Sequence, residues 1–275
     1  MLRLLSLAVA FLTSFSTSHP APHAPPRPRV VTTSARAVSA PPRPVMGGDV
    51  SWPNCPRSVG IPGRHGYNLP MPVRSARFVV VGATNGPAFT RNPCIARQSR
   101  WAKAHHLPMA AYAVIHFPTR AELHRYGGHG TAGQRVRRAG AVQARVALAT
   151  LRRAHVPAPV VWVDVETVGG HPWSRGVGAN RALLSGVLAE YRRYHVRTGI
   201  YSYRSAWRHI MGGLRLRSYP TWVPSGSSFR AGALRKCRQP SFSGGRVLMT
   251  QWSAGRRDYD ITCPGVRADA LFRKA

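Results

Sequence analysis

The chain has 275 residues, 44% of them apolar, and a chain of this length can bury a substantial core as one domain. Its formal net charge is +32, from 40 Lys and Arg against 8 Asp and Glu. Such an excess attracts polyanions, but no recognition motif and no interleaved aromatic and basic pattern accompanies it, so we expect no specific nucleic-acid partner. A biased amino-acid composition that merely leaves a solvated basic surface would give the same excess of positive charge.

The N-terminal segment is typical of an exported protein. Arg3 precedes an apolar run over residues 4–13, and small residues follow it, which predicts a signal peptide at residues 1–19. The run is shorter than the roughly 20 residues of a membrane span, so we expect no transmembrane segment in the mature protein. Residues 20–45 are rich in Pro, Ala and Arg and predict an extended linker. The mature protein is expected to be secreted, extracellular or associated with the cell wall, and monomeric.

Residues 46–275 predict one α/β domain. Short apolar runs rich in β-branched residues alternate with helical patterns, which is typical of βα units in a largely parallel sheet. The predicted strands are residues 46–52, 77–84, 109–116, 160–166, 198–203, 221–224, 247–252 and 259–261. The predicted helices are residues 94–106, 134–155, 177–195 and 205–211. Eight strands indicate a closed barrel.

The fourth strand carries two carboxylates in a run that otherwise predicts burial, VVWVDVET at residues 160–167. Side chains alternate across a strand, so Trp162, Asp164 and Glu166 share one face, directed to the barrel interior or mouth. Catalytic groups of barrels lie at the C-terminal ends of strands. Five of the 8 acids lie at three strand ends, these two with Asp49, Asp258 and Asp260.

A structural explanation competes with catalysis, because with 40 cations available each acid can find an Arg partner, and a buried Asp–Arg pair can hold a barrel together. The other three acids, Glu122, Glu190 and Asp269, fall in helix-like or terminal segments, where a surface salt bridge explains them.

Several motifs, taken in their order, resemble those of glycoside hydrolase family 25, the lysozyme-type muramidases, and within it a secreted, cysteine-containing group. The resemblance covers about residues 46–272. The motifs are GGDVSWPNCP, FVVVGATNGPAFTRNPC, VVWVDVETVGGHPW, TGIYSYRSAW, TWVPSG and SFSGGRVLMTQWSAGRRDYDITC. The resemblance implies an irregular (β/α) TIM-like barrel that cleaves peptidoglycan or another cell-wall glycan at its C-terminal rim.

The resemblance implies four catalytic acids: Asp49, Asp164, Glu166 and Asp260, with Glu166 as the general acid. Asp258 competes with Asp260 for the last position, and Asp260 is the better match. Crowded carboxylates keep one another protonated, whereas nearby Arg would hold them ionised. Asp164 is a nucleophile, assists the substrate's N-acetyl group or activates water; carboxyl separations of about 5 Å favour retention and about 6.5 Å or more favour inversion.

Aromatic and histidine side chains near the same strand ends are candidates for sugar binding: Trp52, Tyr112, His116, Trp173, Tyr201, Trp222 and Trp252. Filling of the barrel explains Tyr201 equally well, and a structural role explains His116 equally well. The other histidines lack the spacing of metal ligands, so we expect no metal and no cofactor.

Four cysteines in an exported chain predict two disulfides, and none has the Cys-x-x-Cys spacing of zinc sites. Counting allows three pairings. The predicted strand order favours Cys55 with Cys94 and Cys237 with Cys263, both at the rim that carries the acids.

Three functions remain open: a wall-degrading glycosidase, a catalytically inactive carbohydrate-binding or cell-wall-binding barrel, and a cationic protein that binds polyanions, including anionic wall polymers.

Overall fold

A computed structural model describes residues 40–61, 63–167 and 169–274. The predicted signal peptide and residues 20–39 of the predicted linker lie outside the described residues.

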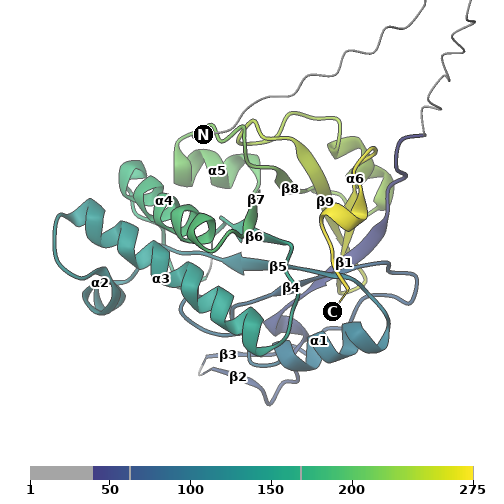
Figure 1. Cartoon of the computed structure of the whole chain (residues 1–275), viewed down its shortest axis with the longest axis horizontal. Coiled ribbons are helices and arrows are strands. Elements are labelled where there is room, and N and C mark those ends of the chain that lie inside the picture. The colour runs from purple at the N-terminus through teal and green to yellow at the C-terminus, as the bar shows by residue number, and fades with distance from the viewer. Residues whose placement is uncertain (1–39, 62, 168, 275) are drawn as a thin grey trace, which may run out of the picture. The chain divides into compact units, whose positions relative to one another are not determined.

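Eight strands form a closed barrel in the order β1-β10-β9-β8-β7-β6-β5-β4, which confirms the predicted fold class (Figure 1). Each predicted strand is present, with its ends moved by a few residues. Their bounds are β1 (Met46–Val50), β4 (Val79–Gly82), β5 (Met109–Val114), β6 (Val160–Asp164), β7 (Arg197–Tyr201), β8 (Thr221–Pro224), β9 (Val247–Ala254) and β10 (Arg257–Thr262). A small hairpin, β2 (Gly60–Ile61) with β3 (Arg64–His65), lies outside the barrel sheet.

The last strand runs against its neighbours. β10 pairs antiparallel with both β1 and β9, whereas the other neighbouring strands pair parallel. Asp258 therefore lies opposite Asp49 near the C-terminal end of β1, and Ile261 lies opposite Met46 at its start. The chain beyond Thr262 consequently leaves the barrel at its N-terminal end.

Six helices are seen among the described residues: α1 (Ile95–Ala104), α2 (Arg120–Gly127), α3 (Ala132–Arg153), α4 (Val177–Arg193), α5 (Arg204–Met211) and α6 (Arg230–Lys236). The four predicted helices are confirmed, and α2 and α6 are additional. Two short 3-10 turns, η1 (Trp52–Asn54) and η2 (Ala268–Ala270), complete the elements. The signal for α2 is its capping box, in which Thr119 accepts from the Glu122 N–H and Glu122 accepts from the Thr119 N–H. None of the helices described here is long and apolar enough to cross a membrane.

Helices α3 and α4 run side by side in Figure 1 and pack closely through glycines. A Cβ at Gly140 would lie 2.2 Å from the Leu183 carbonyl oxygen, and one at Gly186 would lie 1.9 Å from that of Arg137. Larger residues at either position would force the helices apart.

The core has two layers, as the alternation in the fourth strand predicts. Val161, Val163 and Val165 pack outward against helix residues such as Leu183. Trp162 and Trp222 fill the barrel, and Phe78 stacks on Phe272 beneath them with 3.9 Å between ring centroids. This apolar filling closes the N-terminal part of the barrel interior, so the acidic side chains of the strands gather toward the other end.

Candidate active site

A cavity of about 270 Å³ opens at the C-terminal end of the barrel, and we call it the acidic pocket. Seven of the eight barrel strands or the residues that follow them contribute to its lining. The lining residues are Asp49, Tyr112, Asp164, Glu166, Tyr201, Trp222, Gln251, Ser253 and Asp258. The remaining strand, β4, ends at Gly82, where a Cβ would come within 3.0 Å of the Tyr112 ring, so a glycine leaves room for this phenol.

Four of the five acids predicted to cluster line this pocket. Asp49 and Asp258 are direct partners in the β1–β10 ladder, while Asp164 ends β6 and Glu166 follows it. Asp260 points to the same interior but lies one pleat deeper, opposite Gly47 and Gln251, and it is fully buried. The structure therefore brings Asp258, the lower-ranked candidate, to the cavity and leaves Asp260 beneath it.

Two residues of β9 organise the acids. The Tyr201 hydroxyl donates to Gln251 Oε1 at 2.8 Å, and Gln251 Nε2 donates to Asp49 Oδ2 at 2.8 Å. The Ser253 hydroxyl donates to Asp258 Oδ1. Neither Gln251 nor Ser253 is among the residues predicted from the sequence. Their signal was available, because they flank Trp252 on the opposite face of an apolar strand.

Burial raises the pKa values of the carboxyls in the pocket. For Asp49, burial and the charge of Asp258 raise the pKa to about 8, against a smaller lowering by Gln251. For Glu166, burial and Asp258 raise it to about 7. Burial, then the charges of Glu166 and Asp49, raise the pKa of Asp164 well above its usual range. Asp164 Oδ1 has no hydrogen-bond partner among the described residues. At neutral pH the cluster therefore retains protons.

Asp260 is a neutral acid inside the barrel. Burial raises its pKa, and the nearby Asp49 and Asp258 raise it further. Neither of its carboxyl oxygens lies in hydrogen-bonding geometry with a donor among the described residues. An ionised carboxylate in such a site would carry a large desolvation cost, so the group holds its proton.

No Arg, Lys or His lines the acidic pocket among the residues described. Within the same residues, carboxylate ion pairs form only at the three acids outside the cluster: Glu122 with His116, Glu190 with Arg145 and Arg193, and Asp269 with Arg267. Among the described residues no clustered acid has an Arg partner, so that explanation is wrong. The predicted surface salt bridge is confirmed for Asp269, whereas Glu190 is buried and Glu122 accepts from the ring of the buried His116.

The predicted sugar-binding aromatics divide into two groups. Tyr112, Tyr201 and Trp222 line the pocket, and burial raises the pKa of both phenols, which keeps them as hydrogen-bond donors. Trp52 and Trp173 do not line the pocket. The Trp173 indole N–H donates to the backbone carbonyl of Glu166 at 2.8 Å and so helps to position this residue.

Trp252 and His116 are not part of the pocket. Trp252 stacks on Tyr259 on the outer face of the barrel, in a cluster with Ala233 of α6. His116 is fully buried, and its Nδ1 accepts the Ala88 N–H at 3.0 Å, so its ring proton is on Nε2 and faces Glu122 at 3.1 Å. Neither side chain therefore lines the acidic pocket.

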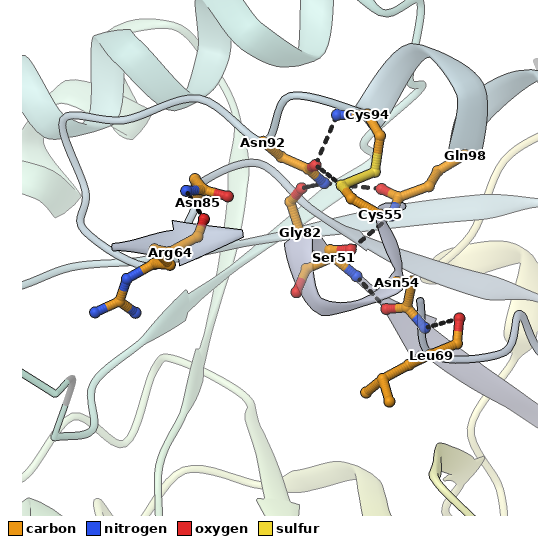
Figure 2. Close-up of a disulfide and its surroundings, with 10 residues drawn as sticks. All are labelled: Ser51, Asn54, Cys55, Arg64, Leu69, Gly82, Asn85, Asn92, Cys94 and Gln98. Atoms are coloured by element: carbon orange, nitrogen blue, oxygen red, sulfur yellow. Dashed lines mark hydrogen bonds between the residues drawn. A yellow bond between two sulfur atoms is a disulfide. The ribbon is translucent and has the colours of Figure 1, made fainter. Parts of the chain in front are cut away.

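The first disulfide joins the loop after β1 to the loop after β4, and Figure 2 shows it with its surroundings. Cys55 and Cys94 are bonded with their Cα atoms 5.7 Å apart, which confirms this pairing. Beside them, Asn92 Nδ2 donates to the Gly82 carbonyl at 2.8 Å, and Gln98 Nε2 donates to the Ser51 carbonyl at 2.6 Å. Buried polar contacts of this kind fix the loops after β1 and β4 against each other at the rim.

The second disulfide, Cys237 with Cys263, is also confirmed, with a Cα–Cα distance of 5.5 Å. Its predicted position at the acidic rim is wrong. Because β10 runs antiparallel, Cys263 lies beside the start of β1, where the Thr262 N–H donates to the Val45 carbonyl at 3.0 Å. This bridge therefore braces the opposite end of the barrel.

Comparisons with known proteins agree with this architecture. A family model described as lysozyme-like protein 1 matches residues 131–225, a segment that includes Asp164 and Glu166. No curated protein sequence matches the chain. The bacterial lysozyme from Streptomyces coelicolor is similar in structure, with 15% identity, a TM-score of 0.50, and coverage of 82% of this chain and 94% of that chain.

The modular autolysin LytC from Streptococcus pneumoniae, solved in complex with a synthetic peptidoglycan ligand, has 12% identity and a TM-score of 0.52, covering 79% of this chain and 46% of that chain. The chain has the barrel fold of the lysozymes. A family GH25 lysozyme from Aspergillus fumigatus is also similar, with 16% identity and a TM-score of 0.49, covering 80% of this chain and 94% of that chain. The structures with TM-scores of 0.50 and 0.52 confirm the predicted barrel fold.

In this lysozyme-type barrel the cluster of acids is not arranged as a metal centre. Among the described residues, no group of three or more His, Cys, Asp and Glu side chains could hold a metal ion. The pocket instead combines carboxyls that keep a proton with hydrogen-bond donors from Tyr, Gln and Ser, which is a set suited to acid-assisted cleavage of a polar substrate.

Proposed function

We propose that this protein is a glycosidase that cleaves the glycan strand of peptidoglycan. The observation that carries the proposal is a pocket lined by four carboxyls and no cation, in which the pKa of Glu166 is raised to about 7. Glycosidic cleavage needs one protonated carboxyl beside another that carries negative charge, and environments that separate their protonation states provide both.

Glu166 is the general acid in this proposal. Its side chain is only partly buried, so it can reach a substrate oxygen, and its raised pKa leaves a proton available near neutral pH. Trp173 fixes its backbone from outside the pocket. A proton donated to the leaving oxygen removes the need to expel an alkoxide.

Asp258 supplies the negative charge. It is also partly exposed, the Ser253 hydroxyl donates to it, and its charge raises the pKa values of Asp49 and Glu166. Positive charge that develops at the anomeric carbon is stabilised by such a carboxylate. Asp49 and Asp164, more deeply buried, hold protons and orient the substrate.

The cell wall is the proposed substrate because of the fold and the disulfides. LytC, a barrel of the same fold, is described as an autolysin in complex with a synthetic peptidoglycan ligand. Two disulfides and no free cysteine occur among the described residues, which suits an oxidising compartment outside the cytoplasm. We therefore also propose that the protein is exported and acts at the wall.

The test is digestion of purified peptidoglycan by the wild type and by Glu166→Gln, read by reducing-sugar release and by mass spectrometry of the products. The proposal expects new reducing ends from the wild type and a near-complete loss in the variant. Binding of wall fragments by the wild type without any new reducing end would identify a carbohydrate-binding barrel instead.

A further inference from the structure

A second and larger cavity, of about 820 Å³, lies at the N-terminal end of the barrel, opposite the acidic pocket. It is formed by the segments that precede β8 and β9, the end of α6 and the turn after β10. Four arginines line it and no Asp or Glu does, so we call it the arginine pocket: Arg215, Arg217, Arg238 and Arg246.

The four guanidinium groups have no carboxylate partner among the described residues. The Arg–carboxylate pairs found there involve Arg145, Arg193 and Arg267 only. The side chains of the pocket arginines also donate no hydrogen bond within the same residues, and all four are exposed. Their donors are therefore available to a ligand, and their charges add rather than cancel.

The loops that carry these arginines are fixed by the fold. The Cys237–Cys263 disulfide joins two walls of the cavity. The Ser241 hydroxyl donates to the Gly245 carbonyl at 2.7 Å, and a Cβ at Gly245 would lie 1.8 Å from the Tyr219 carbonyl oxygen. The backbone carbonyl of Arg246 accepts from the Thr221 N–H at 2.8 Å. A rigid frame lowers the entropy lost when a ligand binds.

The chemistry of the lining selects the ligand. Guanidinium groups match phosphate oxygens with paired, charge-assisted hydrogen bonds. No aromatic residue of the described part of the chain lines the cavity, so these residues offer no surface on which a nucleobase would stack. Gln239 and Ser241 offer hydrogen bonds to hydroxyls. A volume of about 820 Å³ accommodates more than one phosphate group.

We propose that the arginine pocket binds a polyol polymer joined by phosphodiester groups, of the kind that is attached to or embedded in a cell wall. That this polymer belongs to the wall rests on the proposed function; the binding itself does not. The polymer would hold the protein on its substrate from the end of the barrel that takes no part in cleavage.

The test is calorimetric titration of the full-length mature protein with purified poly(glycerol phosphate). This probe has no glycosidic bond, so its binding and the proposed cleavage can each fail without the other. The variant Arg215→Gln with Arg246→Gln is expected to raise the dissociation constant at least about tenfold, because two phosphate contacts are lost.

The matched control is Arg152→Gln with Arg153→Gln, which removes the same charge from the exposed end of α3. It should change the dissociation constant by less than about threefold, since diffuse charge is screened by salt. Equal weakening in both variants, or no binding by the wild type, would overturn the proposal. Equally tight binding of poly(deoxythymidine), lost in the same pocket variant, would overturn the preference for a polyol.

Discussion

The two ends of this barrel separate charges of opposite sign. The acidic pocket has four carboxyls and no cation, and the arginine pocket has four guanidinium groups and no acid. Both belong to a chain of net charge +32. Net charge therefore does not decide protonation in the acidic pocket, because local burial and the neighbouring carboxylates raise the pKa values there and no cation lines the cavity to lower them.

The two ends are braced alike, by one disulfide each. Cys55–Cys94 fixes the loops beside Asp49, and Cys237–Cys263 fixes the loops that carry the arginines. The bridges close loops with sequence separations of 39 and 26 residues. In the chain-entropy model each is worth roughly 3–4 kcal/mol. Equal covalent support at ends of opposite charge indicates that both ends need fixed loop geometry.

The largest effect should come from Glu166→Gln, which removes the proposed proton donor at nearly constant volume. We expect kcat on peptidoglycan to fall by about 10²–10⁴-fold while binding of wall fragments changes little. Product analysis by mass spectrometry measures the first quantity and calorimetry the second. Unchanged turnover would remove Glu166 from the mechanism and leave the acidic end without an assigned role.

Asp258→Asn should have the next largest effect, and it distinguishes the two candidates of the last strand. Loss of the charge that faces the anomeric carbon should lower kcat by about 10²-fold. Asp260→Asn should lower it by less than about tenfold, because a buried neutral carboxyl is replaced by a neutral amide of similar shape. If Asp260→Asn lowers kcat more than Asp258→Asn does, the acid of the last strand that takes part in cleavage is Asp260 and not Asp258.

The pH dependence of cleavage should follow the proton on Glu166. With a pKa of about 7, activity should fall about tenfold for each pH unit well above neutrality. The charge of Asp258 raises this pKa, so in Asp258→Asn the residual activity should begin to fall at a lower pH. Initial rates on a soluble glycan, measured about one pH unit apart between pH 5 and 9, test both statements. If the activity of Asp258→Asn falls at the same high pH as that of the wild type, Asp258 does not raise the pKa of Glu166.

Stability should respond to pH in the opposite sense to that of a typical ion-paired protein. The carboxyl of Asp49 has a folded pKa of about 8, far above its unfolded value, so between about pH 4 and 8 the folded state binds more protons than the unfolded state. The free energy of unfolding is then highest in acid and falls as pH rises, by up to about 1.4 kcal/mol per unit for each such group.

Asp49→Asn should flatten this slope, as measured by denaturant unfolding at several pH values. Asp269→Asn is the matched control, because its surface pairing with Arg267 lowers its pKa and so places its titration below this range. A stability that rises with pH in the wild type would mean that the clustered acids are ionised in the folded state.

Local sequence patterns were sufficient to predict the barrel and the pocket acids but not the depth or the direction of the last strand. Alternation in VVWVDVET placed Asp164 and Glu166 inside, and the structure agrees. Asp258 and Asp260 have the same parity, so alternation cannot separate them; only the pairing of Asp258 with Asp49 shows which one reaches the cavity.

Strand direction has no local signature either, and this explains the wrong position of the second disulfide. A parallel β10 would have placed Cys263 at the acidic rim, whereas the antiparallel strand takes it to the other end. The outward face of Trp252, in contrast, follows from alternation along β9, because its neighbours Gln251 and Ser253 line the pocket. The four arginines of the arginine pocket lie in segments that are separate along the chain. From the sequence alone they can be recognised only as part of the excess positive charge.

The smallest effect should be that of salt on cleavage of a short soluble glycan. Between about 50 and 300 mM salt we expect its rate to change less than about twofold, because the partly and fully buried charges of the acidic pocket are poorly screened. Attachment of the inactive Glu166→Gln protein to intact walls should weaken at least about tenfold over the same range, as exposed arginines lose their attraction for phosphate. Sedimentation of wall-bound protein measures the second quantity and colorimetric sugar release the first. Salt-independent attachment would show that the arginine end takes no part in holding the wall, and a salt-sensitive rate on the short glycan would show that the two ends are not electrostatically separate.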